Sequence, residues 1–133
     1  MLVYAIAEGA PFQDRARAAL AGPAPNETLS ISRQVLREYL AVMTRPQTWG
    51  NALSLAEAIA DATAFANRFT VLEDGPAPWT QLSDLSRRYA FGGRQVHDAN
   101  IVATMLAHGE HRLLTFNTAD FQRFGALIEP VTP

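Results

Sequence analysis

Short β-prone segments alternate with amphipathic helical patterns along the chain, and this alternation is the feature that most constrains the fold. The β-prone segments lie at 28–31, 70–72, 112–115 and 127–131. The helical patterns lie before and between them, at 11–20, 32–45, 54–69, 78–89 and 95–108. Strands that alternate with helices are typical of βαβ units, whose strands form a largely parallel, helix-covered sheet. The sequence therefore predicts an α/β domain with three αβα layers around a central sheet.

Start and stop signals mark the ends of several of these elements. Ser32 is a good N-cap for the helix that follows it, and Pro46 ends that helix. Gly109 ends the helix over 95–108. Pro130 interrupts the last β-prone segment, which predicts an edge strand because proline has no N–H to donate to a neighbour. The apolar positions predicted to be buried are Val35, Leu36, Leu40, Ile101, Val102, Met105 and Leu113.

The composition indicates one globular domain. A chain of 133 residues with 48% hydrophobic and 18% charged residues is too apolar for a disordered segment and has room for one core. Cysteine is absent, which excludes disulfides, thiolate zinc sites and a cysteine nucleophile, and favours a reducing compartment. The formal net charge of -2 provides no overall attraction to nucleic acid, so any such contact must be local.

The apolar runs do not indicate a membrane protein. The longest, Leu2–Ala7 and Ala99–Ala107, are too short or too interrupted to span a bilayer, which takes about 20 residues. The first run has no basic region ahead of it and is followed at once by Glu8, unlike a signal peptide. We therefore expect a cytoplasmic protein.

Three acidic residues occupy positions where a parallel sheet collects ligands, near the carboxyl ends of strands or in the helix that follows. They are Glu38, Asp98 and Asp120, and they come from three separate segments. Carboxylates brought together from different segments suit a hard cation such as Mg²⁺ or Mn²⁺. Without a cation they would repel one another and raise their own pKa values.

Each acid also has an ordinary interpretation. Asp98 near a helix N-terminus gains from the helix dipole without any metal. Glu38 could be a partly exposed acid paired with Arg33 or Arg37, and Asp120 could cap the short turn over Ala119–Phe124. The periodicity alone leaves these alternatives open.

Longer stretches around these acids resemble a known family. The segments are Val96–Thr104, Leu113–Phe121 and Ser32–Leu40, the last followed by Thr44–Pro46. In combination they resemble PIN-domain ribonucleases, especially the VapC-type toxins of toxin–antitoxin pairs. The resemblance covers almost the whole chain, and it implies a PIN-like αβα fold.

The resemblance implies a site as well as a fold. By this resemblance, the catalytic acids of the family correspond to Glu38, Asp98 and Asp120. Its ligands for one or two Mg²⁺ or Mn²⁺ ions fall on the same three acids and on Asn117. Arg94 and Arg33 are expected to bind substrate phosphate, and His97 to make a supporting hydrogen bond.

The function implied is that of a metal-dependent endoribonuclease toxin that hydrolyses RNA phosphodiesters. The implied partners are the RNA substrate, a cognate antitoxin protein and a second copy of the chain in a homodimer. The alternative is a PIN-like module that binds antitoxin or RNA without cleaving it. Trp49 and Phe65 are candidates for an interface, although such residues are more often part of a core.

The N-terminal segment departs from the family pattern. Members of the family begin with a hydrophobic strand and an Asp-Thr-Asn-like motif, followed by residues similar to Leu2–Ile6. Residues 1–133 are therefore expected to form a single PIN-like domain without the N-terminal strand and the first Asp motif. Either Met1 is an internal methionine of a longer chain, or the protein is shortened. In a third alternative, Leu2–Ile6 takes the strand position itself.

Overall fold

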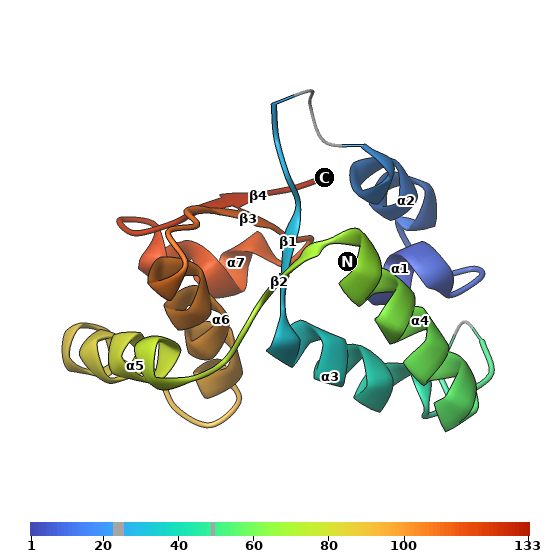
Figure 1. The fold of residues 1–133 in the computed structure, drawn as a ribbon, viewed down its shortest axis with the longest axis horizontal. Coiled ribbons are helices and arrows are strands. Elements are labelled where there is room, and N and C mark those ends of the chain that lie inside the picture. Colours follow the sequence, from blue (N-terminus) through green and yellow to red (C-terminus); the bar gives the residue numbers. More distant parts are fainter. Residues whose placement is uncertain (23–25, 49) are drawn as a thin grey trace. The chain divides into compact units, whose positions relative to one another are not determined.

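The computed structural model describes residues 1–22, 26–48 and 50–133, and it divides into two compact units (Figure 1). The first unit comprises Met1–Val71 and the second Leu72–Pro133. Each unit combines helices with short strands, and each has its own hydrophobic core. Trp49, an interface candidate from the sequence, lies outside the described residues.

The first unit begins with two helices, followed by a strand and two longer helices. Its elements are α1 (Leu2–Ile6), α2 (Gln13–Ala21), β1 (Ser30–Ser32), α3 (Arg33–Met43) and α4 (Leu55–Arg68). β2 (Thr70–Leu72) follows at the boundary between the units and pairs with β1. The Thr70 N–H donates to the Leu29 carbonyl at 3.3 Å.

The core of the first unit lies between α3 and α4. Ser32 caps α3 as predicted, because its hydroxyl accepts a hydrogen bond from the Val35 N–H at 3.3 Å. The buried Tyr39 ring packs edge-on against Phe65 of α4, so Phe65 belongs to the core. The Tyr39 hydroxyl donates to Asp61 Oδ2 at 2.6 Å. Burial, followed by the hydrogen bond and the charge of Asp61, raises the pKa of the Tyr39 phenol.

Leu2–Ile6 forms a helix, so the alternative in which this run takes a strand position is wrong. The Ala5 N–H donates to the Met1 carbonyl at 3.2 Å, and the Ala7 N–H donates to the Val3 carbonyl at 2.9 Å. Leu2 and Ala5 are both buried, and their spacing of three residues places them on one helical face. An apolar run of five residues suits either structure, and packing of this face against the core decides in favour of the helix.

A capping box fixes the start of α4. The Ser54 hydroxyl accepts from the Glu57 N–H at 3.2 Å, and Glu57 Oε2 accepts from the Ser54 N–H at 2.8 Å. The Ser54 hydroxyl also donates to Glu57 Oε2 at 2.7 Å. These hydrogen bonds hold the pKa of the Glu57 carboxyl below its usual value.

Replacing Ser54 with alanine is expected to lower the free energy of unfolding by about 1 kcal/mol, the usual effect of losing such a cap. A lowered pKa stabilises the fold above the unfolded-state pKa, and this contribution is lost as pH falls through the folded-state pKa. Urea unfolding should therefore show a difference between wild type and Ser54→Ala near neutral pH that shrinks in acid. Ser54→Thr keeps the cap and is the control, and a difference independent of pH would contradict this account.

The second unit combines two long helices, which pack on each other, with a short parallel ladder. Its elements are α5 (Pro76–Arg88), α6 (Gln95–Ala107), β3 (Arg112–Leu114), α7 (Thr118–Phe121), the 3₁₀ turn η1 (Gln122–Phe124) and β4 (Glu129–Val131). β3 and β4 are parallel, as predicted, with Leu113 opposite Pro130. Its buried core residues are Leu85, Ala99, Val102, Ala103, Met105, Phe121, Phe124 and Ile128.

Most predicted elements are confirmed, with shifts at their ends. The helix expected over 11–20 begins at Gln13, because Phe12 adopts a left-handed conformation with φ 62°. The helix expected from Pro78 begins at Pro76. Among the positions predicted to be buried, three are buried and four are half-buried against a core. The buried ones are Leu36, Val102 and Met105, and the half-buried ones are Val35, Leu40, Ile101 and Leu113.

Within the described ranges, every helix is too short or too polar to cross a membrane.

Candidate active site

Asp98 lies in the first turn of α6, the helix that carries the core of the second unit. Gly93, in a left-handed conformation with φ 54°, leads into this helix, and the Val96 N–H donates to its carbonyl at 3.2 Å. The next residue, Ala99, is fully buried, which fixes the rotation of α6 and leaves Asp98 half-buried at the rim of the core. This position fits two roles for the Asp98 carboxylate equally well: interaction with the helix dipole and ligation of a metal ion.

A chain of hydrogen bonds after β3 orients Asp120. The Thr115 N–H donates to the Val131 carbonyl at 2.9 Å, which extends the β3–β4 ladder by one residue. The Thr115 hydroxyl accepts from the Asn117 N–H at 3.1 Å. The Asn117 side-chain amide donates to Asp120 Oδ2. Asn117 and Asp120 are both exposed, so this turn presents a carboxylate and an amide side chain together.

The segments that carry Asp98 and Asp120 come together in the core of the second unit. Helix α6 contacts α7, and Ala99 and Phe121 belong to the same buried cluster. Each of these apolar residues directly follows one of the two acids in the sequence. Packing of the core therefore holds the two acid-bearing segments against each other.

Glu38 lies on α3 of the first unit and is exposed. Its Oε1 accepts a hydrogen bond from the side-chain amide of Gln34 at 2.7 Å, one helical turn earlier. The buried amide of Gln34 is thus one donor that orients this carboxylate, and the pairing with Arg33 or Arg37 that the sequence pattern suggested stays a prediction. The spacing of four residues was the available signal for the Gln34–Glu38 pair.

The candidate ligands offer a donor set that suits a hard cation. Glu38, Asp98 and Asp120 supply carboxylates and Asn117 an amide, and oxygen donors are what Mg²⁺ and Mn²⁺ prefer. Among the residues that the structure describes, no three His, Cys, Asp or Glu side chains gather closely enough to hold a metal. Because Glu38 belongs to one unit and the other ligands to the second, the convergence of all three acids stays a prediction.

The remaining residues of the candidate site also divide between the units. Arg33 begins α3 and is half-buried, whereas Arg94 is exposed at the N-cap of α6, one turn before Asp98. His97 is exposed in the first turn of the same helix. The second unit thus contains one predicted phosphate ligand together with two of the predicted catalytic acids.

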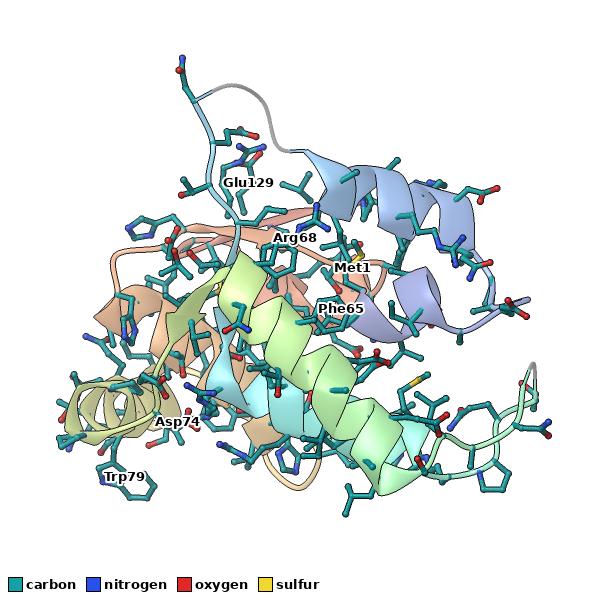
Figure 2. All side chains as sticks on the ribbon, turned by 45° about the vertical axis from the view of Figure 1, so that its right-hand side comes forward. Met1, Phe65, Arg68, Asp74, Trp79 and Glu129 are labelled. Atoms are coloured by element: carbon teal, nitrogen blue, oxygen red, sulfur yellow. The ribbon has the colours of Figure 1, made fainter. Side chains whose placement is uncertain are left out.

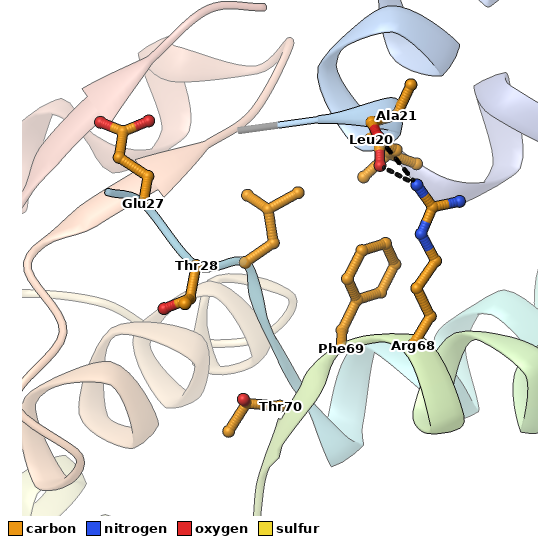
Figure 3. A pocket seen from close by; sticks show the side chains of 8 residues that line it. Leu20, Ala21, Glu27, Thr28, Arg68, Phe69 and Thr70 are labelled. Atoms are coloured by element: carbon orange, nitrogen blue, oxygen red, sulfur yellow. Dashed lines mark hydrogen bonds between the residues drawn. The ribbon is translucent and has the colours of Figure 1, made fainter. Parts of the chain in front are cut away.

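A pocket of about 330 Å³ lies elsewhere in the first unit, at the ends of α2 and α4 (Figure 3). Arg68 from its wall donates through Nη2 to the carbonyls of Leu20 and Ala21, at 2.7 Å and 3.2 Å. The same guanidinium lies over the Phe69 ring, 5.3 Å from its centroid. A cation on the last carbonyls of a helix stabilises that helix, so we assign Arg68 a structural role.

The sequence matches the family model of the PIN domain over residues 1–127. The chain therefore belongs to the PIN domain family, as its resemblance indicated.

Solved structures with a similar fold include two from VapBC systems. One is VapBC2 from Rickettsia felis bound to a DNA fragment from its promoter, with 19% identity and a TM-score of 0.62 over 98% of this chain and 92% of that chain. The other is VapBC-1 from nontypeable Haemophilus influenzae, with 18% identity and a TM-score of 0.62 over 87% and 82% of the two chains. They confirm the predicted mixed α/β PIN fold. No curated protein matches the chain in sequence.

Proposed function

We propose that this chain is a metal-dependent endoribonuclease, the toxin of a type II toxin–antitoxin pair. The observation that carries the proposal is the pair of acid-bearing segments, around Asp98 and Asp120, that the core of a PIN-family chain packs together. We further propose that residues 1–133 act as one PIN domain, since the family match runs through both units.

Glu38, Asp98 and Asp120 would hold the cation, and Asn117 would orient Asp120 or ligate a second ion. Bound there, Mg²⁺ or Mn²⁺ supplies a Lewis acid and lowers the pKa of a ligated water. Arg94 and Arg33 would neutralise the substrate phosphate and fix its position.

The proposed partners are RNA, an antitoxin protein and a second copy of the chain. Similarity to chains of two VapBC structures supports the antitoxin. A two-fold homodimer is the commonest assembly of soluble oligomers and is what the family resemblance implies.

The test is cleavage of single-stranded RNA by the full chain in Mg²⁺ or Mn²⁺, with EDTA as the reference. We expect cleavage that requires the metal and returns when Mn²⁺ is added in excess of EDTA. Binding of RNA without cleavage in either metal would favour the alternative of a binding module. Cleavage that persists in EDTA would contradict the metal-dependent mechanism.

A further inference from the structure

Arginines concentrate at the connection between α5 and α6 in the second unit. All eleven basic residues of the chain are arginines, because the sequence contains no lysine. Arg88 ends α5, Arg94 stands at the N-cap position of α6 without a side-chain cap hydrogen bond, and Arg123 of η1 reaches the same connection. All three are exposed. We call Arg88, Arg94 and Arg123 the arginine rim.

One hydrogen bond and two ring contacts order the Arg88 and Arg123 part of this rim. Arg123 Nη1 donates to the Ala90 carbonyl at 3.2 Å, which ties η1 to the connection. Tyr89 packs against the buried Phe124 ring with centroids 5.2 Å apart, and Arg88 lies over the Tyr89 ring at 5.6 Å. The Arg88 guanidinium therefore lies on an ordered aromatic ring and Arg123 is held by a backbone carbonyl, so less side-chain entropy is lost when these two bind a ligand.

The segment that carries Arg88 and Arg94 is free of acidic residues. The sequence has no acidic residue between Asp84 and Asp98. Arg87 in the same segment is paired with Asp84, with Nη1 and Oδ1 2.5 Å apart, so we leave it out of the rim. In a chain with a net charge of -2, such a cluster is the local basic surface that nucleic-acid binding would require.

The chemistry of the rim favours RNA over an acidic protein. Guanidinium groups bind phosphate in bidentate fashion and also stack on bases. Arg94 lies one helical turn from Asp98, so a strand bound along the rim leads to the candidate catalytic acid.

We propose that the arginine rim binds consecutive phosphates of a single-stranded RNA beside the cleavage site, with Arg88 and Arg123 outside that site. The proposal rests on the proposed function for its substrate, but it concerns binding and not cleavage. It assigns Arg88 and Arg123 to positioning the RNA, and neither is expected to contact the reacting phosphate.

The experiment measures the affinity of the full chain for a fluorescent poly(U) oligonucleotide in EDTA, between about 50 and 200 mM salt. The slope of log affinity against log salt is expected to fall in magnitude by about 0.7 for each arginine removed, as for single strands. The variant is Arg88→Gln/Arg123→Gln. Arg88→Lys/Arg123→Lys keeps the charge and should keep most of the slope.

Arg17→Gln/Arg45→Gln is the matched control, because it removes the same charge from exposed positions outside the rim, and Arg17, like Arg123, donates to a backbone carbonyl. It should leave the slope close to that of wild type, and thermal unfolding of every variant checks the fold. An unchanged slope in Arg88→Gln/Arg123→Gln, or an equal change in the control, would overturn the proposal. Displacement of the RNA by polyglutamate at equal charge would also overturn it, in favour of an acidic protein partner.

Cleavage by the wild-type chain separates this inference from the proposed function. Metal-dependent cleavage by wild type, together with an unchanged salt slope in Arg88→Gln/Arg123→Gln, would overturn the proposal that the rim binds RNA and would support the proposed nuclease function. A reduced salt slope in that variant, without any cleavage by wild type, would support RNA binding by the rim and count against the proposed nuclease function.

Discussion

Replacing Phe124 with alanine is expected to lower the free energy of unfolding by about 3 to 5 kcal/mol, the usual effect of truncating a buried Phe. The Phe124 ring is 1% exposed and packs against Tyr89 and Phe91. Its carbonyl also accepts from the Ile128 N–H at 3.1 Å, just before β4. A domain has only about 5 to 15 kcal/mol of stability, so this one change threatens the second unit.

Trp79→Ala is the matched control, because it removes an even larger ring from the same unit. Trp79 is 71% exposed and projects from α5 (Figure 2). Its loss is expected to change the free energy of unfolding by no more than about 0.5 kcal/mol. Urea unfolding monitored by circular dichroism gives both values. Similar losses in the two variants would show that Phe124 does not anchor the core.

Asp98→Asn is expected to reduce metal-dependent RNA cleavage by about a thousandfold. The change keeps the size of the side chain and removes its charge, so the fold should persist while a cation ligand is lost. The rate falls about tenfold for each 1.36 kcal/mol of lost transition-state stabilisation. A ligand that contributes about 4 kcal/mol therefore accounts for a loss of about a thousandfold. Single-turnover cleavage in Mn²⁺ measures the loss.

Asp84→Asn is the control for this substitution. Asp84 is an exposed acid of α5 in the same unit, where it pairs with Arg87. Its replacement should leave the cleavage rate within about twofold of the wild-type rate, since one exposed ion pair contributes little to stability. Equal rates for Asp98→Asn and wild type would leave Asp98 with only its helix-dipole role.

Local chemistry made the longer helices predictable from the sequence. Ser32 and Ser54 provide cap hydrogen bonds within three residues, and the structure contains both. Leu2–Ile6 was ambiguous because an apolar run of five residues carries no clear period. The next helix begins later than predicted because Phe12 adopts a left-handed backbone conformation. Phenylalanine rarely adopts this conformation, and no sequence pattern indicates it.

In the candidate site, too, local contacts were predictable from the sequence and longer-range contacts were not. The Gln34–Glu38 and Asn117–Asp120 hydrogen bonds join residues four and three positions apart, so spacing could have predicted them. The link between Asp98 and Asp120 instead passes through burial of Ala99 and Phe121, which depends on tertiary packing. Convergence with Glu38 requires packing over a still longer range, and a local pattern does not encode it.

The most direct test of the central claim is a double-mutant cycle on Mn²⁺ affinity. The variants are Glu38→Gln, Asp98→Asn and the combination of both, with free Mn²⁺ measured by electron paramagnetic resonance. If both carboxylates ligate one ion, each single change should weaken binding by more than the 10–100-fold typical of outer-shell partners. The two effects should then be coupled by more than about 0.5 kcal/mol. Additive effects, or a Glu38→Gln variant that binds Mn²⁺ as wild type does, would contradict a shared metal site.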